Sequence, residues 1–145
     1  MRALSLLLAQ GAKEGADHSI DLWGAGINEF RARSFPSLTQ IFLFVRIEVE
    51  PKDPVRPLHF FEMRIVEGTR EVVPWSRTPL VLTRRPDGRG YVNIINQLTF
   101  PTLEAGEGVI ETKMDGQPFP SLHYTVMLLG APSEGGGPTG KTGLN

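Results

Sequence analysis

The chain has 145 residues, with 15 Lys and Arg against 16 Asp and Glu, which gives a formal net charge of -1. This length fits one domain, and the near balance of charge argues against binding nucleic acid through its phosphates. The sequence contains no Cys, which excludes disulfides, thiolate metal ligands and cysteine nucleophiles.

The chain opens on an apolar stretch, Ala3–Ala9, which ends at Gln10-Gly11. It is similar to a weak secretory signal, but it has the minimum apolar length and a single Arg before it. We therefore interpret it as a buried opening strand and expect a protein that is not secreted. No stretch approaches the roughly 20 apolar residues that a membrane helix needs, so we expect no membrane partner.

The clearest strand signal lies between Ile41 and Val49, where every odd position is a branched aliphatic residue. Such period-two alternation predicts a strand with one face fully in the core. The even positions begin with Phe42 and Phe44 and end with Arg46 and charged residues. We expect something to cover the aromatic half of this second face, either another part of the chain or a partner.

Shorter strand signals follow at regular spacing. Residues 20–23 are expected to form a long-looped hairpin with the opening strand, and residues 11–19 to form its loop. Residues 70–73 and 80–83 lie next to prolines, which favours edge strands. Further strands are predicted at 58–66, 91–98, 109–113 and 122–129, with a tight Asp115-Gly116 turn between the last two. No window shows a helical period, so we predict an all-β antiparallel β-sandwich or jelly-roll-like barrel of about eight or nine strands.

The composition changes at Gly130. Six of the 16 glycines fall within residues 130–145, a segment with almost nothing to bury. We therefore divide the chain into a β-sandwich domain, 1–129, and a Gly/Pro-rich C-terminal arm, 130–145. Such an arm gains order on contact with a partner, which favours a neighbouring subunit or a larger assembly.

Two glycine motifs suggest nucleotide binding. Residues 135–142 satisfy G-x-x-x-x-G-K-[ST], but only three residues follow Thr142, too few for the helix that a phosphate loop requires. Gly24-Ala25-Gly26 lacks the third glycine of a dinucleotide fingerprint, since Glu29 occupies that place. We interpret the first motif as a compositional accident and the second as a glycine bend.

No other pattern predicts catalysis. His18, His59 and His123 lie far apart and lack the spacing of metal ligands, so we interpret them as ordinary hydrogen-bonded side chains. No Ser lies in a nucleophile elbow. The basic cluster of Arg84, Arg85 and Arg89 brackets a turn and is interpreted as a solvated loop. We therefore predict a protein that is not an enzyme and has no cofactor and no metal.

A set of structural positions gives the chain a family resemblance over residues 3–129. It resembles a poorly characterised family of small bacterial and phage-borne β-sandwich proteins of unknown function. The positions that carry the resemblance are Leu7-Leu8-Ala9, Ile20–Gly26, Phe35-Pro36, Val45–Glu50, Arg56, Phe60–Arg64, Phe100-Pro101, Gly106 or Gly108, and Asp115-Gly116. The resemblance implies a fold, and it implies no catalytic residue.

A compact β domain with a Gly/Pro-rich C-terminal arm is also similar in architecture to the capsid decoration proteins of tailed phages. This likeness implies a homo-oligomer, for example a trimer, that docks on a larger protein shell at the virion surface. Outside that setting we expect a cytoplasmic protein. The expected interaction residues are Phe42, Phe44, Trp75, Pro132, Pro138 and Leu144.

A second hypothesis comes from the aromatic residues. A β-sandwich can hold a sugar or another small molecule on an aromatic face, and Trp23, Trp75 or Tyr91 could provide it. This hypothesis predicts a monomeric carbohydrate- or ligand-binding module.

Overall fold

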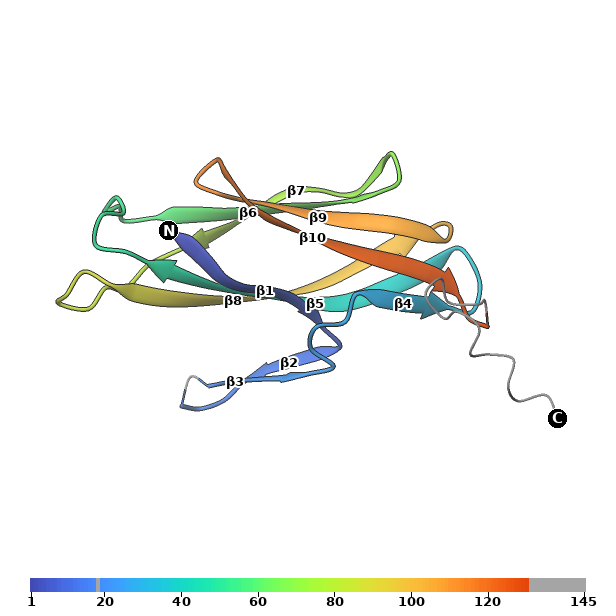
Figure 1. The fold of residues 1–145 in the computed structure, drawn as a ribbon, viewed down its shortest axis with the longest axis horizontal. Helices are drawn as coiled ribbons and strands as arrows, with labels where there is room; N and C mark the ends of the chain where they lie inside the picture. The colour runs from blue at the N-terminus through green and yellow to red at the C-terminus, as the bar shows by residue number, and fades with distance from the viewer. Residues whose placement is uncertain (18, 131–145) are drawn as a thin grey trace, which may run out of the picture.

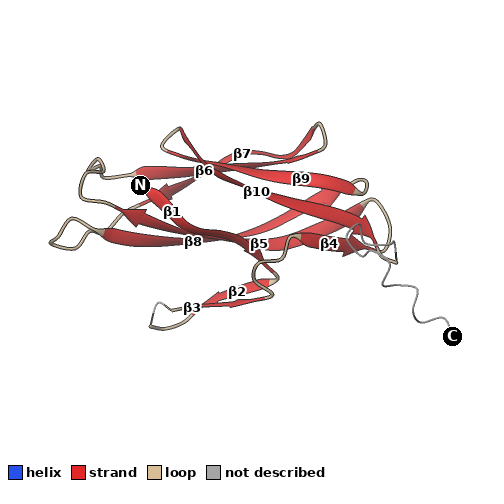
Figure 2. Ribbon diagram, in the orientation of Figure 1, coloured by secondary structure: helices blue, strands red, loops and turns tan. Residues whose placement is uncertain are grey.

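The computed structural model describes residues 1–17 and 19–130, and these residues form strands and connections without a helix (Figure 2). The strands are β1 (Arg2–Ala9), β2 (Gly11–Glu14), β3 (Ile20–Trp23), β4 (Glu29–Ala32), β5 (Ser37–Val49), β6 (His59–Glu67), β7 (Arg70–Leu80), β8 (Gly90–Thr102), β9 (Gly106–Met114) and β10 (Gln117–Leu128). The predicted all-β class is confirmed.

Two sheets face each other and make the sandwich (Figure 1). One sheet has the order β1-β5-β8 and the other β4-β10-β9-β6-β7. All pairs within them are antiparallel except β4 with β10, which is parallel. The hairpin β2–β3 lies outside the sandwich, against the outer side of the β1-β5-β8 sheet. The two sheets do not close into one barrel, so the sandwich alternative of the prediction holds.

The alternation predicted along β5 sets the position of the core. Ile41, Leu43, Val45 and Ile47 are fully buried, and they face the inner side chains of the opposite sheet. Because β5 pairs with β1 on one side and β8 on the other, its inner face anchors both neighbours. The buried residues of the opposite sheet include Phe61, Met63, Ile65, Ile110, Met114, Tyr124 and Val126.

A polar cluster crosses between the sheets beside this core. The Tyr124 hydroxyl donates to Glu67 Oε2 at 2.9 Å, and the Thr102 hydroxyl approaches the same oxygen at 3.3 Å. Thr102 also hydrogen-bonds Thr39 at 2.8 Å. Burial, together with the charge of the Glu67 carboxylate, raises the pKa of Tyr124 well above its usual range. The cluster links β5 and β8 to β6 and β10 by side chains, where no backbone ladder joins the sheets.

The observed strands differ from the predicted ones in three places. β3 pairs with β2 rather than with the opening strand, because Gly11–Glu14 forms a strand where a loop was expected. β4 was missed, since its four residues gain their pairing from β10, far along the chain. The stretches 70–73 and 80–83 were predicted as separate strands, but β7 runs through Pro74 and Pro79 to Leu80. Its position at the sheet edge, where a missing N–H costs no ladder bond, agrees with the prediction.

The Asp115-Gly116 turn between β9 and β10 is confirmed. Both residues have positive φ, 51° and 80°, which matches the twist of a two-residue hairpin. Asp115 N–H also donates to the carbonyl of Phe60, at the start of β6, so the turn is tied to a third strand.

Gly108 in β9 provides a test of the packing around the polar cluster. A Cβ at this position would overlap the ring of Tyr124, which is 2% exposed and cannot move without losing its hydrogen bond to Glu67. We expect Gly108→Ala to lower the free energy of unfolding by about 1–3 kcal/mol. In chemical denaturation, the loss in the double variant Gly108→Ala/Tyr124→Leu should be smaller than the sum of the two single losses. Additive losses would contradict the proposed overlap.

Candidate functional site

Phe42 and Phe44 lie on the outer face of β5, as the sequence predicts. Phe44 pairs in register with Leu7 of β1 and Ile95 of β8, so the three side chains share one face. Phe44 is only 9% exposed and Phe42 is half-buried. Ala9, on the same face, is fully buried. The hairpin β2–β3 lies beside this face, so the chain itself covers most of Phe44 and leaves part of Phe42 accessible.

Trp75 lies on β7, on the outer side of the larger sheet. Its ring receives the Lys113 ammonium at 4.2 Å and the Arg64 guanidinium at 5.1 Å. Arg64 is itself held by Glu111 at 2.6 Å and by Glu71 at 3.3 Å. These cations engage the π system of a half-buried indole. Trp75 is therefore part of a side-chain network with Arg64 and Lys113. A partner that contacts the Trp75 ring would also meet these two cations.

The aromatic residues of the second hypothesis are arranged differently. Tyr91 has Arg46 and Arg85 near its ring, at 5.1 and 5.5 Å. Trp23 is 54% exposed and packs over Gly11, where any side chain would collide with the indole. Trp23 has the most exposed side chain of the three candidate platforms. Within the described part of the chain no cation lies over its ring, whereas cations lie over the rings of Trp75 and Tyr91.

The basic cluster is a structural feature of the loops. The Arg84 guanidinium donates to the carbonyls of Asp53 and Pro54, at 2.7 and 3.0 Å, and also reaches those of Glu50 and Pro51. Because Arg84 ties down the 50–54 loop and Arg85 lies against Tyr91, the two side chains do not converge on a common anion site.

One end of the sandwich gathers exposed apolar residues. β4, the end of β10, the start of β5 and the end of β8 meet there, and the chain leaves β10 at this end (Figure 1). We call the four exposed leucines at this end the leucine rim: Leu38, Leu103, Leu128 and Leu129. Leu129 N–H donates to the carbonyl of Ala32, which fixes the exit of the chain beside β4. Leucines exposed singly are ordinary, whereas several at one end make that end a candidate contact surface.

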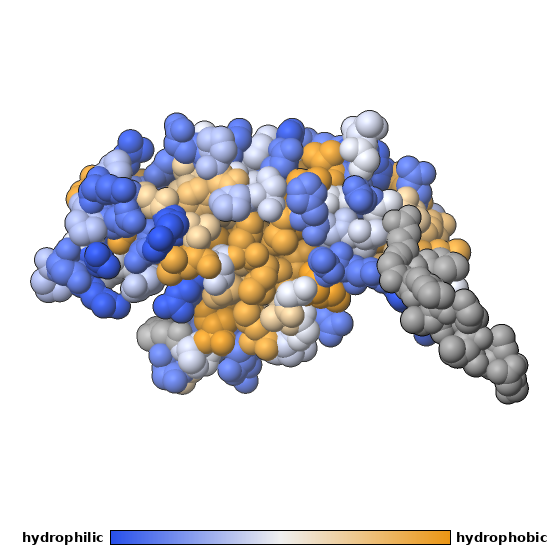
Figure 3. All heavy atoms as spheres, in the orientation of Figure 1, coloured by the Kyte–Doolittle hydropathy of each residue, from blue (hydrophilic) through white to orange (hydrophobic). Residues whose placement is uncertain are grey.

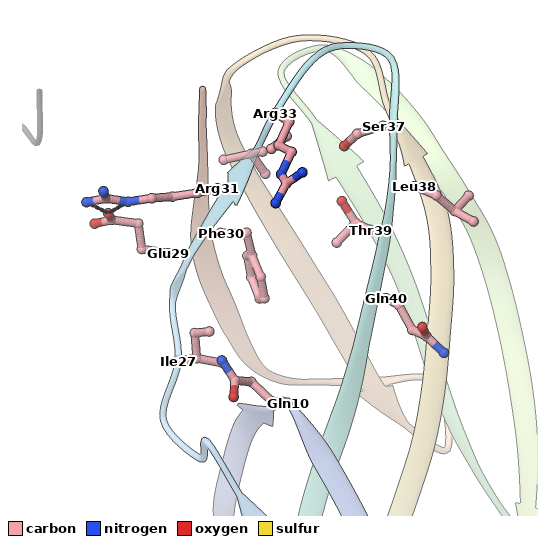
Figure 4. A pocket seen from close by; sticks show the side chains of 12 residues that line it. Gln10, Ile27, Glu29, Phe30, Arg31, Arg33, Ser37, Leu38, Thr39 and Gln40 are labelled. Atoms are coloured by element: carbon pink, nitrogen blue, oxygen red, sulfur yellow. Dashed lines mark hydrogen bonds and ion pairs between the residues drawn. The ribbon is translucent and has the colours of Figure 1, made fainter. Parts of the chain in front are cut away.

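A groove of about 520 Å³ opens at the same end, between β4 and the start of β5. Figure 4 shows Arg33, Phe30 and Thr39 directed into the space between the strands, and the Glu29–Arg31 pair directed away from it. Leu38 and Val126 are also part of its lining. The lining of the groove thus mixes apolar residues with a larger number of polar ones, Arg33 among them, which suits a peptide segment better than a small apolar molecule.

A second hydrophobic area lies along the side of the sandwich where β1 faces β10. Figure 3 shows apolar surface gathered over β1 and toward the hairpin β2–β3. Leu6 and Leu122, on these two strands, are half-buried and pack against the core. This area is the partly open side of the core between sheets that do not pair there.

His59 and Asp115 form the best-defined ionisable pair. His59 is 1% exposed, and its Nδ1 lies 2.6 Å from Asp115 Oδ2. The other carboxylate oxygen accepts the N–H of Phe60 at 2.8 Å. Burial opposes ionisation of Asp115, but these two hydrogen bonds and the nearby charge of Arg56 outweigh it, so the pKa of Asp115 is lowered. The pair fastens the β9–β10 turn to the start of β6.

The other predicted groups do not assemble into a site. His123 lies exposed on β10, far in sequence and sheet position from buried His59, and His18 lies outside the described residues. Within residues 1–17 and 19–130, no three His, Asp or Glu side chains are placed to hold a metal ion. Gly24 and Gly26 take positive φ after β3, and Gly26 N–H donates to the carbonyl of Leu8, so this motif is a turn.

The predicted arm residues Pro132, Pro138 and Leu144 lie outside the described residues, as does the phosphate-loop-like motif at 135–142. Over the described part of the chain, no helix has the length and apolar character to span a membrane. No known protein-family model matches the sequence, and no curated protein is detectably similar to it.

The His59–Asp115 pair predicts a pH dependence of stability. Because folding lowers the pKa of Asp115, its contribution is present above the unfolded pKa of about 4 and is lost as the pH falls through the folded pKa. We expect Asp115→Asn, which tolerates the positive φ, to reduce the free energy of unfolding at pH 7 by about 1–3 kcal/mol. The difference from the parent chain should shrink below pH 4 in denaturation measured across pH.

Asp87→Asn is the matched control, because Asp87 caps the N–H of Arg89 in an exposed turn and makes no buried ion pair. It should change stability little at any pH. A pH-independent loss in Asp115→Asn would contradict the role of its charge.

Proposed function

We propose that the protein is a non-catalytic assembly protein, of the kind that decorates a phage capsid. It forms homo-oligomers, such as trimers, and docks on a larger protein shell at the virion surface. The observation that carries the proposal is the leucine rim at the end of the sandwich from which the C-terminal segment departs. There an apolar contact surface and a Gly/Pro-rich segment that can extend over a neighbour occur together.

Three further features support this proposal. The groove beside the rim carries Arg33 at its mouth, which offers a polar contact at the edge of an apolar surface. The hydrogen bond from Leu129 N–H to the Ala32 carbonyl fixes where the chain leaves the sandwich. Any contact that the arm makes therefore starts from a defined point on the fold. Phe42 keeps part of its ring accessible on another face, where it can add to a contact between copies.

A carbohydrate- or ligand-binding module is the second candidate. The exposed indole of Trp23, supported from below by Gly11, is the observation that favours it. A flat aromatic ring held in this way can stack on a sugar face. The two candidates differ in their solution mass, because the binding module needs no second copy.

The assembly proposal predicts effects of rim substitution and arm deletion on mass. We expect the full chain to have the mass of more than one copy in light scattering, and Leu38→Asp/Leu129→Asp to lower the association. Val55→Asp/Leu58→Asp adds the same charges to exposed apolar residues away from the rim and should leave the mass unchanged. A full chain with the mass of one copy up to high micromolar concentration would contradict the proposal.

Removal of residues 131–145 tests the arm separately. We expect the shortened chain to keep its fold in circular dichroism but to lose binding to the protein shell in co-sedimentation with purified capsids. Full binding and an unchanged oligomer would remove the arm from the mechanism and leave the rim.

The binding-module candidate predicts a tryptophan fluorescence signal. The chain has two tryptophans, so Trp75→Phe leaves Trp23 as the only reporter. If the module hypothesis holds, a glycan panel should contain a sugar that shifts the emission of Trp75→Phe, and that does not bind Trp23→Ala in calorimetry. No shift with any sugar would remove this candidate.

A further inference from the structure

The sandwich has four edge strands, which are β1 and β8 in one sheet and β4 and β7 in the other. An edge strand presents unpaired N–H and C=O groups that can pair with a strand of another chain. Proteins usually protect such edges with prolines, charges, bulges, short strands or covering loops. An edge without such protection is where the fold permits pairing.

Three edges are protected. β7 contains Pro74 and Pro79, and its register with β6 shifts twice. β4 has only four residues, two of which are the charged Glu29 and Arg31. β1 has a register shift between Ala3 and Ser5, and near its end the carbonyl of Leu8 is occupied by Gly26 N–H. Each device limits the length over which another strand could add to that edge.

β8 carries such devices only at its ends, where Pro101 precedes its last residue and Thr83 lies against Gly90. It has 13 residues and pairs with β5 in an unbroken register along its whole length. The ten residues Tyr91–Phe100 include no proline and no charged side chain. Between Tyr91 and Thr102, no backbone group of the described chain outside the sheet ladder bonds to β8. A groove of about 560 Å³ runs along its first half, between residues 91–95 of β8, the segment after β7 with Val81 and Thr83, and the β2–β3 hairpin with Glu14 and Ile20.

We infer that β8 pairs antiparallel with β8 of a second copy, about a two-fold axis near Asn96. The pairing joins the two β1-β5-β8 sheets into one continuous six-stranded sheet. A second copy suits this edge because the strand is uncharged, so self-pairing brings no like charges together. A charged partner strand would find no charged side chain within Tyr91–Phe100 to complement it.

Pairing about Asn96 also places inner-face residues of one copy opposite inner-face residues of the other, and outer-face residues opposite outer-face residues. It places Ile94 opposite Leu98 of the second copy, both on the inner face. On the outer face, Asn93 lies opposite Thr99 of the second copy, so exposed polar side chains meet each other. Because the parity of inner and outer positions is kept, no apolar core residue is turned to solvent.

This inference rests on the proposed assembly function and deepens it, since it names one contact between copies. A two-fold contact joins copies in pairs. Oligomers larger than a pair, such as the trimer, need the leucine rim as a second contact between copies. The β8 edge lies on a different part of the molecule from the leucine rim, which belongs to one end of the strands. Because the two β8 strands run in opposite directions, the pair would carry its two rims and its two arms at opposite ends.

The double variant Asn93→Lys/Thr99→Lys tests the register. In the inferred pair it places two ammonium groups directly opposite each other at two symmetric positions, and we expect the dissociation constant between copies to rise about tenfold. Asn93→Lys/Thr99→Glu places opposite charges at the same positions and should restore the association. Sedimentation velocity across the micromolar range measures both.

The control is Thr69→Lys/Gln117→Lys, which adds the same two charges at an exposed turn residue and at the exposed first residue of β10. Circular dichroism and thermal unfolding check that each variant is folded. If the chain self-associates and Asn93→Lys/Thr99→Lys behaves like the control, the β8 inference is wrong and the assembly proposal stands. If the β8 variants alter the association but rim substitution and arm deletion change neither mass nor capsid binding, the inference stands and the proposed docking function fails. A chain with the mass of one copy at every concentration overturns both.

Discussion

The central strand β5 carries the constraint on which the rest of the molecule depends. Its odd side chains are buried without exception from Thr39 to Val49, and a shift of one residue would turn all of them to the outer face. The free energy that would be lost by exposing these side chains fixes the register of β5 with both of its neighbours, β1 and β8. The outer face, with Phe42 and Phe44, is then determined as well, and the hairpin β2–β3 follows as the element that covers it.

The polar cluster between the sheets complements this apolar constraint. Hydrophobic contact holds the two sheets together but is not directional, so it does not by itself fix how one sheet lies over the other. The hydrogen bonds from Tyr124 and Thr102 to Glu67 are directional, and they specify which residues of the two sheets meet. The cluster draws on the start of β5 and the ends of β6 and β8, close to the leucine rim. A surface that binds another protein benefits from such a rigid support, because less order has to be gained on contact.

Much of the fold could be predicted from local patterns. The alternation along residues 41–49 and the Asp115-Gly116 turn are local signals, and both predictions are confirmed. β4 could not be predicted in the same way, because Glu-Phe-Arg-Ala becomes a strand only through a parallel partner nearly a hundred residues later. β2 was hidden for a similar reason, since Gly-Ala-Lys-Glu has the composition of a turn.

The candidate surfaces were predictable only in part. The outer position of Phe44 follows from parity, but the presence of the hairpin β2–β3 beside that face does not. The His59–Asp115 pair joins residues 56 positions apart and has no signal in either neighbourhood. The leucine rim is likewise invisible in the sequence, because its members come from β5, β10 and the chain after β8 and meet only when the sandwich forms.

The parallel pairing of β4 with the end of β10 has a mechanical consequence. A pull applied at Gly130 acts along β10, so the hydrogen bonds to β4 on one side and to β9 on the other are loaded in shear. Bonds loaded in this way share the force and must yield together, whereas a hairpin peeled from its open end loses them one at a time. A pull along β10 through the C-terminal segment would therefore be resisted by both ladders of β10 at once.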